Sequence, residues 1–115
     1  MKYLALYMMP SAGLEEWMKL PESERKAQEE TMKGEWDAWA KEHASAIKET
    51  AGAGKTKRVD TSGTKDVKND IMLCSIVEGD SPDAVSKMFE GHPHLAIPGA
   101  WIEVMPMNTL PGMQS

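Results

Sequence analysis

The stretch from residue 91 to residue 106, Gly-His-Pro-His-Leu-Ala-Ile-Pro-Gly-Ala-Trp-Ile-Glu-Val-Met-Pro, constrains the fold more than any other part of this chain. Gly91 is typical of the residue just past a helix end, where positive φ is often required. After the turn signal at Pro98 and Gly99, side chains alternate between two faces, as they do in a strand. One face would hold Trp101, Glu103 and Met105, and the other Ala100, Ile102 and Val104. The sequence therefore predicts a helix that ends at Gly91 and a final strand over residues 101–105.

Two of the three histidines, His92 and His94, lie in this stretch. Pro93 biases His92 toward an extended backbone. If His94 is extended as well, both imidazoles lie on the same side of the chain. The rings could be metal ligands or loop residues that bond to nearby backbone. A metal site needs at least a third ligand and no HExxH or CxxC spacing supplies one, so we expect no metal and no cofactor.

Composition limits the class of protein. The chain has 115 residues, enough for one domain with a core of its own. Its net charge is −5 and it has no long basic stretch, which argues against a nucleic-acid partner. No run approaches the ~18 apolar residues of a membrane span. A single cysteine, Cys74, excludes an intramolecular disulfide and suits a reducing compartment, so we expect a cytoplasmic protein.

Apolar and amphipathic runs predict the remaining elements. Residues 3–9 follow one lysine and are at the short limit for a signal peptide, so we interpret them as a first buried strand. A short helical turn is expected at residues 14–20, and Pro21 suits the first position of a long amphipathic helix. Residues 71–77 form a second apolar strand, and Ser81 is a typical N-cap for a second helix. The stripe of the long helix comprises Met32, Trp36, Trp39, Ala40, His43 and Ile47.

Residues 48–70 are the polar part of the chain. Thr61-Ser62-Gly63 indicates a hairpin turn, so we expect a polar edge strand and its return. Residues 52–56, Gly-Ala-Gly-Lys-Thr, resemble part of a phosphate-binding loop. The full motif needs a glycine where Glu49 stands, and no strand–loop–helix unit surrounds the segment, so we reject this interpretation.

The order strand, helix, strand, strand, helix, strand is the ferredoxin-like pattern. It predicts an α+β domain over residues 1–107, in which two helices cover one face of a four-stranded antiparallel sheet, with a loose tail at 108–115. On the other face we expect Tyr3, Tyr7, Trp101, Glu103 and Met105. So much aromatic surface should not stand open to water, and a second subunit is the cover that we predict.

With this order established, the chain resembles the YCII-related family, also called the DGPF family, of dimeric α+β barrels. The resemblance covers residues 1–107, and its most specific part is the closing stretch from Pro93 to Pro106. The other matching segments are Met1-Lys-Tyr-Leu-Ala-Leu-Tyr, Thr50-Ala-Gly and Ser81-Pro-Asp-Ala-Val. The resemblance implies a small bacterial protein that forms a homodimer.

Some members of that family carry a histidine in the first long helix and an aspartate before the last strand, proposed as an acid–base pair. Counting back from Thr50 without gaps places Glu35 at the histidine position, and His92 stands at the aspartate position. The Gly-Pro-Phe signature is missing, because Gly52 is followed by Ala53. The resemblance therefore makes Glu35 and His92 the candidate catalytic pair. We expect them to face one another, with the carboxylate raising the pKa of the histidine.

The candidate ligand-binding residues are Tyr3, Tyr7, His94, Trp101 and Glu103. The aromatic members could line a pocket for a flat organic ligand or fill a dimer interface, since both kinds of site share this composition. Two classes of function stay open. One is an enzyme that performs acid–base chemistry on a small organic molecule in a dimer-associated cleft. The other is a non-catalytic ligand-binding or accessory module of the same shape.

Overall fold

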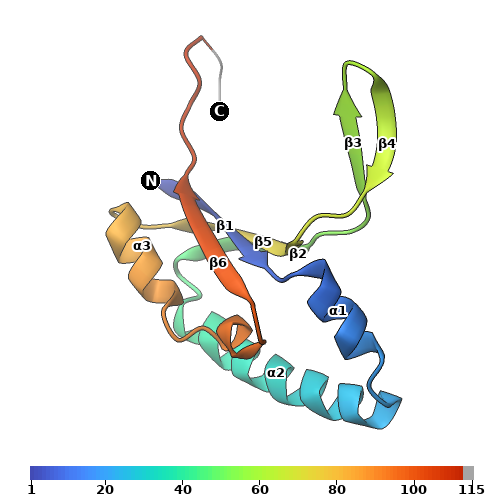
Figure 1. Cartoon of the computed structure of the whole chain (residues 1–115). Coiled ribbons are helices and arrows are strands. Elements are labelled where there is room, and N and C mark those ends of the chain that lie inside the picture. The colour runs from blue at the N-terminus through green and yellow to red at the C-terminus, as the bar shows by residue number, and fades with distance from the viewer. Residues whose placement is uncertain (113–115) are drawn as a thin grey trace.

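A four-stranded antiparallel sheet forms the middle of the computed structural model, which describes residues 1–112 (Figure 1). Its strand order is β2-β5-β1-β6. The strands are β1 (Lys2–Met8), β2 (Ile47–Gly52), β5 (Ile71–Glu78) and β6 (Trp101–Pro106). The two central strands, β1 and β5, are the two most apolar runs of the sequence. The arrangement confirms the predicted ferredoxin-like α+β fold.

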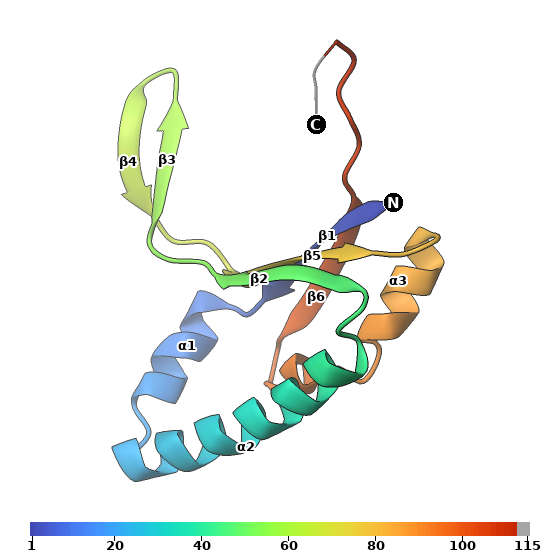
Figure 2. The ribbon, with the colours of Figure 1, turned by 180° about the vertical axis from the view of Figure 1, so that it is seen from behind.

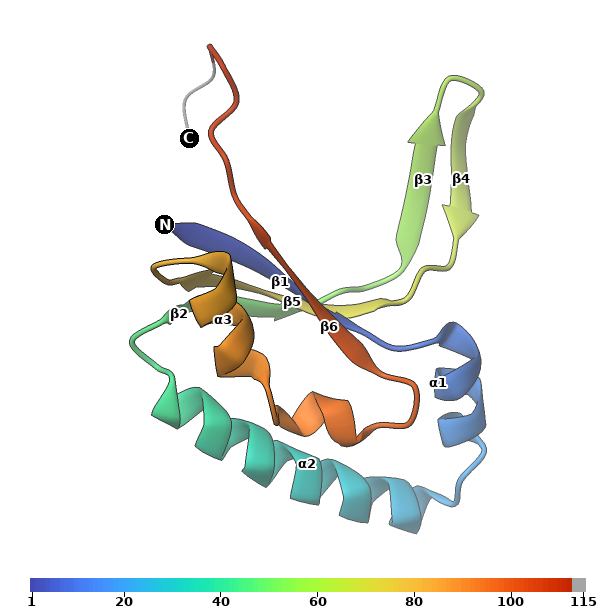
Figure 3. The same cartoon turned by 60° about the vertical axis from the view of Figure 1, so that its left-hand side comes forward.

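The helices gather on one side of this sheet, and α2 runs beneath it (Figure 2). The 3₁₀ helix η1 lies between α2 and the sheet (Figure 3). The helices are α1 (Ser11–Met18), α2 (Glu22–Glu42), α3 (Pro82–Phe89) and η1 (Pro93–Ala96). The predicted start of α3 is confirmed, because the side chain of Ser81 accepts a hydrogen bond of 3.1 Å from the Ala84 N–H. Pro21 is the residue before the first turn of α2 rather than its first helical residue.

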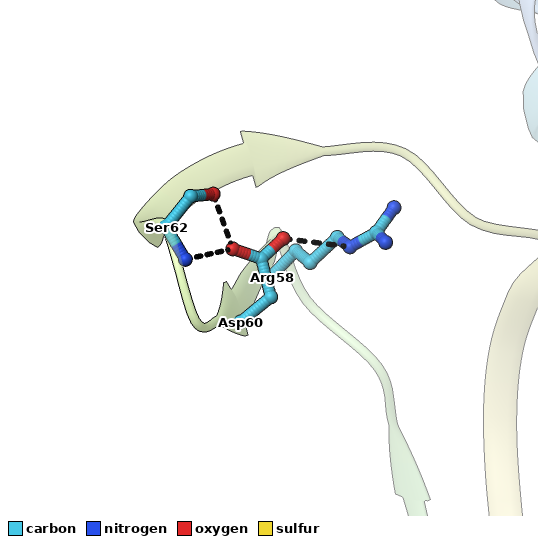
Figure 4. Close-up of polar contacts among 3 residues, drawn as sticks. All are labelled: Arg58, Asp60 and Ser62. Carbon is cyan, nitrogen blue, oxygen red and sulfur yellow. Dashed lines mark hydrogen bonds and ion pairs between the residues drawn. The ribbon is translucent and has the colours of Figure 1, made fainter.

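The polar segment between β2 and β5 forms an additional hairpin, β3 (Thr56–Asp60) and β4 (Gly63–Val67), which is a two-stranded sheet of its own. It projects away from the helices (Figure 1). The turn is where the sequence predicts it, since Asp60 Oδ1 accepts bonds from the backbone N–H (2.9 Å) and the hydroxyl (2.6 Å) of Ser62, and Arg58 contacts its other oxygen (Figure 4). The edge strand of the main sheet is β2, and the hairpin is inserted after it.

The predicted faces of β1 are wrong. Tyr3, Ala5 and Tyr7 point to the helices and are 0%, 0% and 1% exposed, whereas Leu4, Leu6 and Met8 are half-buried on the open face. Both faces of this strand are apolar, so alternation alone could not tell them apart. The side chains of β6 lie as predicted: Trp101 is opposite Met8 and Glu103 is opposite Leu6, so both belong to the open face.

The core fills the space between the sheet and the helices. Its buried members are Tyr3, Ala5, Tyr7, Trp39, Val77, Val85 and Phe89. Trp39 combines packing with a hydrogen bond, because its indole N–H donates to the Met88 carbonyl at 3.2 Å. This bond ties α2 to α3.

Within residues 1–112, no helix is long and apolar enough to cross a membrane. The predicted loose tail begins at residue 108. Residues 108–112 are exposed and outside any helix or strand, and residues 113–115 lie outside the described part of the chain.

Candidate active site

His92 and His94 are buried in a cluster of aromatic rings beneath the sheet, and each is 1% exposed. The His92 ring centre lies 4.4 Å from that of Trp36, 4.3 Å from that of Trp39 and 5.3 Å from that of Tyr7. The two tryptophans come from α2 and the tyrosine from β1. Both imidazoles are thus held between the long helix and a central strand.

The condition that His94 is extended is not met, because His94 lies inside η1. Its Nε2 is 2.8 Å from the Met8 carbonyl oxygen, and a carbonyl can only accept, so Nε2 carries the hydrogen. Burial lowers the pKa of His94, while hydrogen bonds to the backbone at Met8 and Trp101 act in the opposite direction. His94 therefore anchors η1 to the end of β1.

The two ring nitrogens of His92 differ in their hydrogen bonding. Its Nδ1 accepts a hydrogen bond of 2.9 Å from the backbone N–H of His94, which caps η1. A backbone amide can only donate, so the hydrogen of the neutral ring is on Nε2. The Nε2 atom is buried and has no hydrogen-bond partner among the described residues. An unpartnered buried donor costs about 1–3 kcal/mol, so this atom needs an explanation.

The pKa of His92 is lowered from 6.5 to about 4, chiefly by burial and then by the charges of His94 and His43. Protonation would also place a hydrogen on Nδ1 and remove the cap of η1. The expected rise in this pKa is therefore wrong. At neutral pH His92 is an uncharged ring that carries its hydrogen on Nε2.

A broad hollow of about 570 Å³, here called the histidine hollow, lies between α2 and η1. Glu35 and His92 both line it, but no hydrogen bond or ion pair joins their side chains among residues 1–112, so the expected facing pair is not formed in this structure. Glu35 is exposed, at the edge of the helix. The lining residues are Glu35, Ala38, Trp39, Glu42, Gly91, His92, Pro93, Leu95 and Ala96.

A second hollow of about 550 Å³, here called the methionine groove, lies on the other side of η1. Sequence reasoning missed it, because its walls come from five separate segments and none of them carries a motif. The only signal was the count of ten methionines in 115 residues, since methionine is frequent at adaptable binding surfaces. Its apolar lining includes Met9, Trp17, Met32, Trp36, Met72 and Ile97.

The predicted ligand-binding residues do not converge on one site. Tyr7 and His94 belong to the buried aromatic cluster. Tyr3 is fully buried and lines neither hollow. Trp101 and Glu103 lie on the open sheet face, where the indole N–H donates to Glu103 Oε2 at 2.7 Å. In the described part of the chain, no group of three or more His, Cys, Asp or Glu side chains is placed to hold a metal ion.

The fold and the histidine hollow define a ferredoxin-like α+β protein with a candidate site for a small molecule. No protein-family model matches the chain, and no curated protein matches its sequence. Among solved structures, the chain is similar to 5-chloro-2-hydroxyhydroquinone dehydrochlorinase (TftG) from Burkholderia phenoliruptrix AC1100 in complex with 2,5-dihydroxybenzoquinone. The two share 14% identity over 94% of each chain, with a TM-score of 0.56. This likeness shows a common fold and transfers no residue roles.

Proposed function

We propose that this protein is an enzyme that binds a small organic molecule in the histidine hollow and performs acid–base chemistry on it. The observation that carries the proposal is the buried Nε2–H of His92, which has no partner in the described structure. Buried polar groups are normally paired, and a catalytic or ligand-binding role is one explanation for an exception. In this proposal Glu35, exposed on the same hollow, exchanges the proton with the ligand.

The structural relative supports a flat, oxygen-bearing ligand. The solved dehydrochlorinase of the same fold binds 2,5-dihydroxybenzoquinone, a ring that carries several oxygens. In the present chain the Trp39 side chain lines the hollow and offers a flat apolar wall beside the donor of His92. We infer that a flat ring with a carbonyl oxygen fits here, and that the chain is a cytoplasmic member of the YCII-related family.

We also propose a homodimer built on the open face of the sheet. This face carries half-buried apolar side chains: Leu4, Leu6, Met8, Cys74, Ile76, Trp101 and Met105. An apolar sheet face of this extent is typical of an interface. The hairpin β3–β4 and the chain beyond β6 both project on this side of the sheet (Figure 3), so a second copy would lie between them.

The test is a binding experiment followed by ¹H–¹⁵N spectra, with a panel of small, uncharged cyclic ketones as probes. We expect shifts confined to residues 35–42 and 91–96 on binding. Ala38→Trp should fill the hollow and abolish these shifts, whereas Ala27→Trp, on an exposed part of the same helix outside both hollows, should not. Probes that bind elsewhere, or bind the filled variant equally well, would contradict the proposal.

The second candidate is a non-catalytic binding module, and the methionine groove favours it. Three methionines and two tryptophans are among the residues that line this groove, and none of the three histidines is. If probes bind only there, and Glu35→Gln leaves every property unchanged, the binding-module interpretation replaces the enzyme.

A further inference from the structure

We infer that the histidine hollow abstracts a proton next to the carbonyl group of an uncharged substrate, with Glu35 as the base and the Nε2–H of His92 as the donor to the enolate oxygen. This inference rests on the proposed function and names the reaction and the substrate class of that site.

The geometry of His92 decides which role each residue takes. Its Nδ1 is occupied by the His94 N–H, so the only nitrogen left for a ligand carries a hydrogen and can donate but not accept. A base must therefore come from elsewhere in the hollow, and Glu35 is an exposed carboxylate there. A carboxylate base combined with a neutral imidazole donor is an arrangement that enzymes use for enolisation.

The charges of the hollow select the substrate. Glu35 and Glu42 both line it, and no lysine or arginine is among its lining residues. Two carboxylates disfavour an anionic ligand, while the His92 donor requires an acceptor atom. A carbonyl oxygen on an uncharged molecule meets both conditions. The His92 N–H would interact more strongly with this oxygen as it becomes an enolate, which stabilises the transition state more than the ground state.

The reaction needs no second reactant. The Glu35 carboxylate takes the proton from the carbon beside the carbonyl group. The C–H electron pair forms a C=C bond, and the π pair of the C=O bond moves to the oxygen, which is held by the His92 N–H. The Glu35 carboxylic acid then returns a proton. Return to carbon regenerates the ketone with its hydrogen exchanged, and delivery to oxygen gives the enol isomer.

Aromatic rings are the nearest neighbours of His92 in the ligand-free structure. The Trp36 ring stands at 85° to His92 with ring centres 4.4 Å apart. Aromatic faces are weak acceptors, so a carbonyl oxygen is a better partner for an N–H. Because Nε2 is covered in the ligand-free structure, a side chain that lines the hollow must move to admit the oxygen, and rotamer changes of this kind are common on binding.

The experiment uses 2-indanone, an uncharged bicyclic ketone, in D₂O, and follows the loss of its α-proton signals by ¹H NMR. The full chain should accelerate exchange over buffer alone. Glu35→Gln should lower the protein-dependent rate by a factor of about 100 or more, as expected for loss of a general base. Glu30→Gln, an exposed carboxylate on the same helix outside the hollow, should exchange like the parent.

His92→Asn is the second variant, because asparagine can keep the cap of η1 while it removes the Nε2–H. We expect a native amide spectrum and exchange about 100-fold slower than the parent. We also expect 2-indanone, but not indane, to bind the parent more tightly than the variant. A parent that binds 2-indanone without accelerating exchange, or a His92→Asn variant that exchanges at the parent rate, would overturn this inference and leave the binding proposal standing. If neither 2-indanone nor the other cyclic ketones bind, the proposed function is overturned as well.

Discussion

The phenolic oxygen of Tyr7 on β1 and the Oγ of Ser75 on β5 lie 2.9 Å apart, on the face of the sheet that the helices cover. Ser75 also shares a hydrogen bond of 2.7 Å with the hydroxyl of Thr50 on β2. Three hydroxyl groups thus form a chain across neighbouring strands and satisfy the Tyr7 hydroxyl beneath the sheet. The pKa of Tyr7 is raised, mainly because the phenol is buried.

Removal of Ser75 should destabilise the protein more than removal of the Tyr7 hydroxyl. Ser75→Ala leaves the buried phenol without its partner, which costs about 1–3 kcal/mol. In Tyr7→Phe, Ser75 keeps its bond to Thr50, and the loss should be about 1 kcal/mol. Urea unfolding of both variants gives the two differences. Equal losses would mean that the hydroxyl chain is not formed in solution.

Stability should fall as the pH is lowered from about 6.5 toward 4. In this window the unfolded chain binds a proton at His92 and the folded chain does not, because the folded pKa is lowered to about 4. At the acidic end of this pH range, the difference between the folded and unfolded pKa corresponds to a loss in the free energy of unfolding on the order of 3 kcal/mol. Urea midpoints measured across this range should show a steeper dependence for the parent than for His92→Asn. A parallel dependence would contradict the assignment to His92.

The sequence predicted the element order and the fold because periodicity and capping residues are local signals. The N-cap Ser81, the turn before Gly63 and the alternation from Trp101 to Met105 were all informative for this reason. The faces of β1 were not predictable, since both are apolar and they are distinguished by contacts far apart in sequence, such as the bond from Tyr7 to Ser75 and the packing of Tyr7 on Phe89. Tertiary contacts decided this point.

Two glycines should respond in opposite directions to replacement by alanine. An added Cβ at Gly79 would clash with the Val85 side chain, which is 2% exposed in the core, so Gly79→Ala should cost about 1–3 kcal/mol. At Gly34, inside α2, an added Cβ meets nothing within 4 Å, and Gly34→Ala should stabilise the helix by up to about 1 kcal/mol. Thermal unfolding measures both. A destabilised Gly34→Ala would mean that a partner covers this part of α2.

The open face of the sheet should hold two copies together. Sedimentation at micromolar concentration should give about twice the 12.7 kDa chain mass. Leu6→Glu places a carboxylate in the middle of this face and should give a folded monomer, whereas Ala27→Glu on the exposed side of α2 should stay dimeric. A parent protein that sediments as a monomer with a native near-ultraviolet spectrum would refute the dimer.

The candidate site was predicted in part. The resemblance placed Glu35 and His92 together, and both line one hollow. The sequence could not show that Nδ1 of His92 accepts a hydrogen bond from the His94 N–H. This bond depends on η1, and the residues around Pro93 carry no pattern that predicts a 3₁₀ helix. Burial by Trp36 and Trp39 also required the packing of α2 on η1. These tertiary features make His92 a neutral ring with its hydrogen on Nε2, in place of the histidine of raised pKa that we expected.

The most direct test of this account is the tautomer of His92, read from ¹⁵N spectra of the histidine-labelled protein, with the signal assigned by its loss in His92→Asn. At neutral pH we predict a hydrogen on Nε2 and none on Nδ1, because Nδ1 accepts from the His94 N–H. The ring should stay uncharged until the pH approaches about 4. A hydrogen on Nδ1 at neutral pH, or titration near 6.5, would contradict the account.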